Sequence, residues 1–504
     1  MYEHFLPSLA AVFQLHILLG IALGVIGGLV IGSIPGLTST MAIALLVPVT
    51  FTMDITQALT LLMGVYCGAI SGGLVAAIVL NIPGTPASAS TCLDGYPMAR
   101  NGKPVEALGL GVYASMSGGV LSGLALVLIA PLLASFAMKF GPWEYFSLVI
   151  FTFSCISALA AGSPVKAFLA AGLGIMLSMI GTDPANGVLR YTFGIDGMES
   201  GFNVLPALIG IYAIPQLLAD VDEIGGEKKT AKINFEMKKF MSSFAVVLSR
   251  KVDLLRSTLI GIVIGILPGV GPGLSNIVAY GQARSASKTP EKFGTGELPE
   301  AIIAPEAANN ASMGGALIPM LTLGIPGDAS TLMMLGAFML HDLQPGPLLF
   351  RDSGDVVWVV FISFFIAFAF CTLFYHFFIG VIIKVLSIPQ HYVIPVLLVL
   401  CAIGSYTLNN RMFDVYSFLG FGLLGYFLKT AKFPVLPVIL GLILGHMAEE
   451  QLKLALEMGD ENLLLFFTRP ISCALLIMAA GSFLLPAWLD MKKKRTNITQ
   501  LKAT

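Results

Sequence analysis

Long apolar runs, each bounded by a few polar or turn-forming residues, dominate the chain. A helix that crosses the hydrocarbon core of a bilayer needs about 20 such residues. The pattern therefore predicts an all-α polytopic membrane protein with roughly ten to twelve transmembrane helices, and it lacks the alternating strands of about ten residues that build outer-membrane barrels. The apolar runs fall at about 11–33, 39–52, 55–80, 105–138, 143–161, 165–181, 202–219, 257–280, 301–323, 329–350, 356–386, 391–408, 413–430, 434–448 and 463–489.

Two blocks of the first half recur in the second half in the same order. "GLVIGSIPG" (28–36) aligns without gaps with "GIVIGILPG" (261–269), at an offset of 233 residues. "SGGLVAAIVLNIPGTPAS" (71–88) aligns with "GGALIPMLTLGIPGDAST" (314–331), at an offset of 243. Gly and Pro are common in membrane helices, so chance is the alternative explanation, but agreement at Gly-Pro detail favours a duplication. The first block gives the expected helix breaks Pro35, Gly36, Pro268 and Gly269.

The second block places helix breakers and hydroxyls directly after apolar runs, in "NIPGTPASAS" (81–90) and "GIPGDAST" (324–331). Proline removes a backbone hydrogen bond, and unpaired backbone is tolerated at membrane depth only inside protein or along a wet cavity. Paired discontinuous helices are typical of secondary transporters, where helix ends bind anions and cations. The alternative is that these are only tight kinks between packed helices. The candidate substrate- or ion-binding residues are Asn81, Pro83, Gly84, Thr85, Pro86, Ser88, Thr91, Asn309, Asn310, Ser312, Pro326, Gly327, Asp328, Ser330 and Thr331.

Asp328 is the candidate carboxylate for a co-transported cation, because ionisable residues at membrane depth are expensive and usually functional. The other interpretation is that Asp328 only caps the helix that follows Pro326 and Gly327. Neither Pro-Gly segment contains Lys or Arg. Strong ion pairing with a bound anion is therefore not expected.

Charge is scarce and unevenly placed. Of the 504 residues, 56% are hydrophobic and 11% charged, against roughly 25% charged in soluble domains, so the solvent of this chain is a lipid bilayer. The net charge of −1 argues against a nucleic-acid partner. Lys and Arg concentrate in the loop 220–256 and the tail 491–504, which should be cytoplasmic. The Lys- and Arg-free N-terminus should face outward, which suggests that the repeats 1–219 and 257–490 are inverted.

No enzyme motif stands out. The six cysteines form no CxxC pair and are expected to be buried, and no metal site is expected. "GIPGD" lacks the partner motif of intramembrane aspartyl proteases, and "NGKP" is not a P-loop, so no ATPase is expected. The open alternatives are a transporter and a channel. An internally duplicated chain favours a transporter, because channels usually gain symmetry by assembling subunits around a pore.

Three segments carry a family resemblance: "LNIPGTPASASTCLDGYPMARNGKPVEALG" (80–109), "GILPGVGPG" (265–273) and "SKTPEKFGTGELPEAIIAPEAANNASMGGALIPMLTLGIPG" (287–327). The chain resembles the large membrane subunit of tripartite tricarboxylate transporters. The resemblance implies a multi-pass inner-membrane permease without cofactor, driven by a Na⁺ or H⁺ gradient. It also implies a small membrane subunit, a periplasmic solute-binding protein, inverted repeats and an elevator-like motion.

The resemblance implies a citrate-like tricarboxylate or a related carboxylate as solute. A permease of the same family for a non-carboxylate solute remains an alternative. One departure concerns Pro299, which stands where a more flexible residue is expected in this segment.

Overall fold

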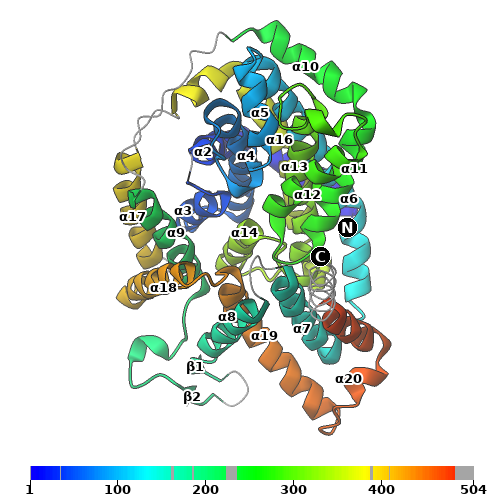
Figure 1. Ribbon diagram of the computed structural model, residues 1–504. Coiled ribbons are helices and arrows are strands. Elements are labelled where there is room, and N and C mark those ends of the chain that lie inside the picture. The colour runs from blue at the N-terminus through cyan, green and yellow to red at the C-terminus, as the bar shows by residue number, and fades with distance from the viewer. Residues whose placement is uncertain are drawn as a thin grey trace, which may run out of the picture. The chain divides into compact units, whose positions relative to one another are not determined.

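A computed structural model describes residues 2–34, 36–159, 164–183, 187–222, 235–385, 390–407 and 409–482 (Figure 1). The described residues are mostly helical. They also include the antiparallel strand pair β1 (Gly181–Thr182) and β2 (Leu189–Arg190) and the short 3₁₀ turns η1 (Tyr2–His4), η2 (Pro86–Ser88), η3 (Asp196–Met198) and η4 (Pro290–Lys292). The α-helices are α1 (Phe5–Val12), α2 (Leu15–Ser33), α3 (Ser39–Thr50), α4 (Ile55–Leu80), α5 (Thr91–Arg100), α6 (Pro104–Ala137), α7 (Pro142–Leu159), α8 (Pro164–Ser178), α9 (Val204–Asp222), α10 (Met237–Ser249), α11 (Lys251–Ile266), α12 (Gly271–Ala286), α13 (Glu300–Leu323), α14 (Ala329–Leu340), α15 (Pro347–Asp352), α16 (Gly354–Val385), α17 (Gln390–Thr407), α18 (Met412–Thr430), α19 (Leu436–Met458) and α20 (Leu465–Thr468).

Four helices of the described part are long and apolar enough to cross a membrane: α2, α4, α6 and α16. Seven further apolar helices are shorter, with 10–17 residues each. These helices confirm the prediction of an all-α polytopic membrane protein. The expected count of ten to twelve transmembrane helices stays a prediction.

The helices group into two compact units. Unit 1 comprises Met1–Met138 and Tyr212–Phe418, and unit 2 comprises Lys139–Ile211 and Leu419–Thr504. Each unit therefore combines a segment from the first half of the chain with a segment from the second. The basic segment 220–256 separates the two halves of the sequence. The compact units do not coincide with these halves.

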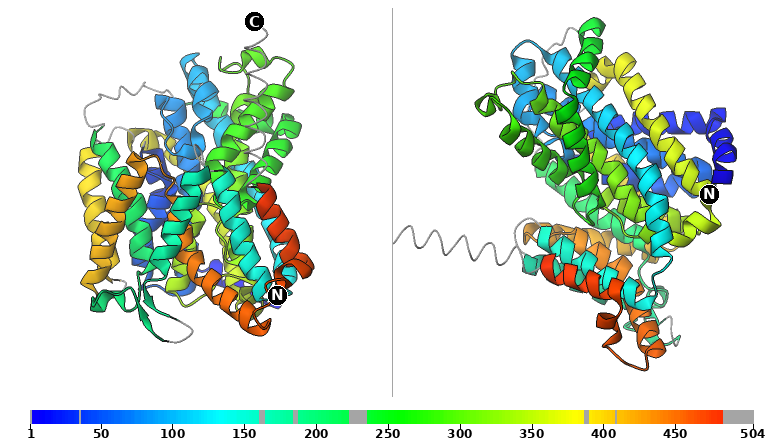
Figure 2. Two further views of the ribbon diagram at one scale, coloured as in Figure 1. Left: turned by 60° about the horizontal axis from the view of Figure 1, so that its bottom comes forward. Right: turned by 90° about the vertical axis from the view of Figure 1, so that its right-hand side faces the viewer.

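In unit 1, α2 lies along α4 because glycines on both helices let their backbones touch (Figure 1; Figure 2). A Cβ atom at Gly28 would press against the carbonyl oxygen of Val65, and one at Gly32 against that of Ala69. From the other side, a Cβ at Gly72 would lie 2.7 Å from the carbonyl oxygen of Leu29. Small residues at such spacing permit close approach of membrane helices.

The pair α11 and α13 repeats this packing in the second half. A Cβ at Gly261 would press against the carbonyl oxygen of Ala308, and one at Gly265 against that of Ser312. The alignment pairs Gly261 with Gly28 and Gly265 with Gly32, and the offset of 243, continued just upstream of the second block, relates Ala308 to Val65 and Ser312 to Ala69. The two helix pairs thus pack at the same register, residue for residue. Which way each pair faces across the membrane stays a prediction.

Both packed pairs end in a short connection to a following helix. α2 ends at Ser33 and α3 begins at Ser39, with Gly36 between them at φ 95°. α11 ends at Ile266 and α12 begins at Gly271, with Gly269 at φ 79°. Glycine tolerates this left-handed backbone region without a Cβ penalty. Pro268 lies in the second connection, and its counterpart Pro35 lies outside the described residues.

The basic segment 220–256 contains helices where it is described. α10 buries Phe240, Ser243 and Val247, which stand three and four residues apart and form one face packed on α6. α11 begins within the same segment at Lys251. The tail 491–504 lies outside the described residues.

Unit 2 is built around α7, α8 and α19, and α8 packs along α19. Its described surface carries an ion-pair network in which Arg190 and Lys453 both reach Asp183 and Glu449, at 2.6–3.6 Å. Such networks hold short strands and helix ends together better than isolated pairs do.

Candidate functional site

The two Pro-Gly segments follow equivalent helices and start in the same way. α4 ends at Asn81, which adopts the left-handed conformation at φ 58°. α13 ends at Gly324, the aligned position, at φ 71°. A left-handed residue terminates a helix and turns the chain away from its axis. The chain then enters η2 and α5 in the first half, and α14 in the second.

Both segments touch the first turn of α12. A Cβ at Gly271 would lie 2.8 Å from Cβ of Asp328, and a Cβ at Gly273 would lie 3.7 Å from the carbonyl oxygen of Pro86. Because Gly271 and Gly273 are two residues apart, the two Pro-Gly segments lie on opposite sides of one helix start. They are therefore neighbours within unit 1. Their role in binding solute stays a prediction.

The second segment is closed. Pro326, Gly327 and Asp328 are buried, and the Asp328 side chain caps α14. Its Oδ1 accepts hydrogen bonds from the Thr331 backbone N–H (2.6 Å) and hydroxyl (2.7 Å), and its Oδ2 accepts one from the Tyr66 hydroxyl (3.0 Å). Both carboxylate oxygens are thus engaged. This geometry agrees with the capping interpretation of Asp328.

Ser330, on the first turn of α14, links the second segment to the first half of the chain. Its hydroxyl lies 2.8 Å from the Ser39 hydroxyl and 3.3 Å from the Thr40 hydroxyl, at the start of α3. The starts of α3 and α14 therefore meet through hydroxyl groups. Sequence reasoning selected Ser330 and did not select its two partners.

The first segment is more open than the second. Asn81, Pro83 and Pro86 are exposed, whereas Gly84 is buried. The Thr85 backbone N–H and carbonyl both contact the Ser88 hydroxyl, at 3.5 and 3.0 Å. The buried Thr85 hydroxyl makes no hydrogen bond of acceptable geometry within the described chain. Residues 81–83 are therefore not covered by the rest of the described chain.

A buried carboxylate that sequence reasoning did not select lies behind the first segment. Glu306, on α13, is fully buried. Its Oε1 accepts a hydrogen bond from the Thr91 hydroxyl (2.5 Å) and its Oε2 accepts one from the Ser115 hydroxyl (2.9 Å). The signal was present in the sequence, because Glu306, Asn309 and Asn310 are spaced to share one helix face.

The two asparagines of α13 differ in their partners. Asn310 accepts a hydrogen bond from the Ser71 hydroxyl of α4 at 2.8 Å and donates to the Glu306 carbonyl at 3.2 Å. Asn309 is fully buried; its amide nitrogen lies beside the Glu306 carboxyl, and its amide oxygen makes no hydrogen bond in the described chain. The Ser312 hydroxyl donates to the Asn309 carbonyl at 2.7 Å, within the helix. Of these two asparagines, only Asn309 thus has a side-chain oxygen without a hydrogen-bond partner in the described chain.

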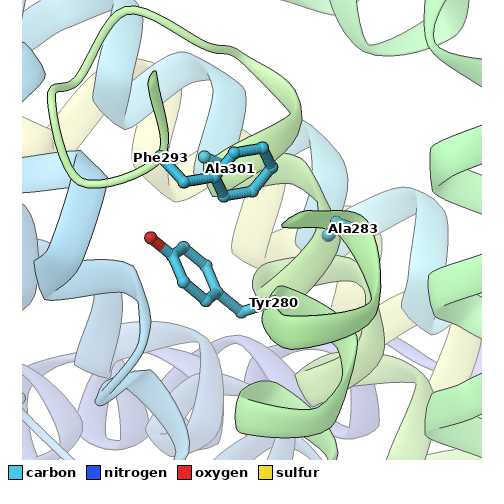
Figure 3. Packing of buried hydrophobic residues seen from close by; sticks show 5 residues of the cluster. Tyr280, Ala283, Phe293 and Ala301 are labelled. Atoms are coloured by element: carbon cyan, nitrogen blue, oxygen red, sulfur yellow. The ribbon is translucent and has the colours of Figure 1, made fainter. Parts of the chain in front are cut away.

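The segment that precedes α13 is anchored by Asp94 of α5, which is fully buried. Its carboxylate accepts hydrogen bonds from the Tyr280 hydroxyl (2.8 Å) and from the backbone N–H groups of Gly294 (2.8 Å) and Gly296 (2.9 Å). Figure 3 shows the adjoining hydrophobic cluster, in which Tyr280 meets the ring of Phe293 edge-on at 5.4 Å. The segment that positions α13 is therefore fixed to α5.

Pro299 stands where a more flexible residue is expected. It directly precedes α13, with φ −59°. That value is close to the one that the proline ring imposes. The residue therefore fits a helix start without strain.

The site is polar but carries no basic side chain. In the part of the chain that the structure describes, neither Glu306 nor Asp328 has an ion-pair partner. The same residues include no group of three or more His, Cys, Asp or Glu placed to hold a metal ion. The chemistry on offer is that of hydroxyls, amides, helix ends and two carboxylates.

Comparison with known proteins gives one family and two relatives. Residues 18–440 match the family model described as the tripartite tricarboxylate transporter TctA family. An uncharacterized 52.8 kDa protein in the TAR-I ttuC' 3' region of Agrobacterium vitis is 33% identical over 435 residues, which make up 86% of each chain. An uncharacterized protein in the TAR-II ttuC' 3' region of the same organism is 33% identical over 238 residues, which cover 47% of this chain and 98% of that protein. No solved structure matches the chain.

Proposed function

The chain belongs to the tripartite tricarboxylate transporter TctA family, and on that premise we propose that it is the permease subunit of a secondary active transporter. In this proposal it takes up a tricarboxylate or a related carboxylate across the bacterial inner membrane. The observation that carries the proposal is that two helix breaks, from opposite halves of the chain, both touch the start of α12. Paired discontinuous helices around one site are the usual architecture of secondary transporters.

The proposed solute site lies between the two Pro-Gly segments. The exposed residue Asn81, the free hydroxyl of Thr85 and the hydroxyl of Ser330 on the first turn of α14 provide uncharged hydrogen-bonding groups. Each such group contributes roughly 0.5–1.5 kcal/mol to holding an anion. Several together give affinities between micromolar and millimolar. The lack of a buried ion pair favours release, since breaking one costs several kcal/mol.

The energy source in this proposal is a Na⁺ or H⁺ gradient. The sequence carries no P-loop for ATP. The two buried carboxylates lack a basic partner within the described chain, and a bound cation balances such charge in the bilayer.

The proposed partners are a periplasmic solute-binding protein and a small membrane subunit. Family membership supports both, because the transporters of this family are described as tripartite. The binding protein captures dilute solute and delivers it to the permease. The nature of that protein's ligand then decides which carboxylate is transported.

Reconstitution tests the proposal. Proteoliposomes that contain the chain, the small subunit and the binding protein should accumulate labelled solute when an inward Na⁺ or H⁺ gradient is imposed, and uptake should saturate with solute concentration. Omitting either partner should reduce uptake at low solute to background. Flux that rises linearly with solute and ignores the gradient would indicate a channel, and full uptake by the chain alone would contradict the tripartite arrangement.

A further inference from the structure

The Glu306 carboxylate is buried among side chains from four helices of unit 1. Thr91 comes from α5, Ser115 from α6, and Asn309 from the same helix as Glu306. Tyr375 of α16 is a further buried residue near Glu306. Its hydroxyl donates a hydrogen bond to the Ser71 carbonyl at 2.6 Å. All five residues are at most 2% exposed. Water therefore does not solvate the charge.

The Asn309 amide is a second, independent sign of a ligand. Its oxygen makes no hydrogen bond within the described chain, and its nitrogen lies beside the Glu306 carboxyl. Leaving buried polar atoms unpaired costs about 1–3 kcal/mol for each group. A ligand that contacts both Glu306 and the Asn309 oxygen removes that cost.

The donor set identifies the ligand chemistry. One carboxylate, two hydroxyl oxygens and one amide oxygen are hard oxygen ligands, and they carry a single negative charge. A monovalent cation neutralises that charge, whereas a divalent ion leaves an excess positive charge in a buried place. From this juxtaposition we propose that Glu306, with Asn309, Thr91 and Ser115, forms the binding site of the co-transported monovalent cation, Na⁺ or a proton.

Asp328 offers a direct contrast. Its two oxygens accept three hydrogen bonds, against two for Glu306, and its side chain caps α14. No unpaired amide lies against it among the described residues. Cation coupling therefore belongs to Glu306, and Asp328 shapes the solute side of the site.

The proposed cation site and the proposed solute site are close in sequence. Thr91 follows the first Pro-Gly segment directly, and Ser90 is tied to α12 by a 2.8 Å hydrogen bond from its N–H to Asn276. A cation that binds the Thr91 hydroxyl therefore acts, through the adjacent Ser90, on α12, which both Pro-Gly segments touch. This gives a route by which cation occupancy shapes the solute site.

The test separates cation binding from solute exchange, because the inference rests on the proposed function. In the reconstituted complex, Glu306→Gln keeps the size of the side chain and removes its charge. We expect it to abolish gradient-driven accumulation and to retain solute counterflow, which moves solute without net cation movement, because glutamine is uncharged like the cation-occupied carboxylate. Asp352→Asn is the matched control, since Asp352 is an exposed carboxylate paired with Arg351. The control should preserve both activities.

Binding of ²²Na⁺ to the purified complex distinguishes the two cations. If the cation is Na⁺, Glu306→Gln should weaken ²²Na⁺ binding by about 100-fold or more, and Asn309→Ala by about tenfold. If it is a proton, the wild type binds no ²²Na⁺, and a pH gradient alone drives accumulation in wild type but not in Glu306→Gln. If Glu306→Gln does not fold, Asn309→Ala and Ser115→Ala carry the same test.

Gradient-driven accumulation by Glu306→Gln equal to that of wild type, with unchanged ²²Na⁺ binding, would overturn the inference. Failure of the wild type to accumulate solute under any gradient would instead reject the proposed function. In that case, loss of ²²Na⁺ binding in Glu306→Gln would still support a cation site.

Discussion

Close packing of α4 on α2 makes a quantitative prediction for Gly72→Ala. The new Cβ would lie 2.7 Å from the Leu29 carbonyl oxygen and 3.1 Å from backbone atoms of Gly32 and Ser33. Ordinary van der Waals contact begins at 3.4 Å, so the helices must separate by about 0.7 Å, enough to forfeit a quarter to a half of the contact energy along the seam. Backbone atoms cannot rotate away. We expect a packing cost of about 1–3 kcal/mol.

A matched control removes the helix-propensity contribution. Gly27→Ala changes the neighbouring helix at a position where no atom lies within 4 Å, and it gains about 1 kcal/mol of helix propensity. Purified variants should be compared by thermal unfolding in one detergent. We expect Gly72→Ala to unfold several degrees below Gly27→Ala. Gly315→Ala, 2.5 Å from the Ile262 carbonyl oxygen, should behave like Gly72→Ala. Equal unfolding temperatures for Gly72→Ala and Gly27→Ala would refute the packing argument.

Three further predictions concern the site and the topology. Asp328→Asn keeps an acceptor for Thr331, so cation dependence of uptake should persist; its loss would return the coupling role to Asp328. Asn81→Ala and Ser330→Ala should each raise the half-saturating solute concentration about threefold to tenfold by removing one hydrogen-bonding group, with unchanged protein in the membrane; an unchanged concentration would place both outside the solute site. In a variant without native cysteines, impermeant thiol reagents applied from outside should label a cysteine at position 3 and not one at position 235, whereas labelling of both would contradict inverted repeats.

The helical class and the places where helices break could be predicted from sequence, because both depend on local physics. Apolar runs of sufficient length require helices in a bilayer, and Gly-Pro pairs interrupt them. The alignment of Gly32 with Gly265 marked equivalent positions, and the structure shows that both pack closely, against Ala69 and Ser312.

The pairing of distant side chains could not be predicted in the same way. Thr91 and Glu306 are 215 residues apart, and no local pattern indicates which hydroxyl meets which carboxylate. The compact units also follow long-range packing rather than sequence order. Asp328 could be selected from sequence because it stands beside a helix break. Glu306 stands inside a regular helix, and no neighbouring helix break distinguishes it.

Solute counterflow tests the central claim most directly. Proteoliposomes with the complete complex are loaded with unlabelled solute and diluted into a trace of labelled solute, without any ion or pH gradient. A carrier with an alternating site exchanges one molecule for another, so labelled solute should accumulate transiently inside above its outside concentration. Simple equilibration without a transient maximum, in vesicles that do pass the solute, would show a pore and would contradict the account.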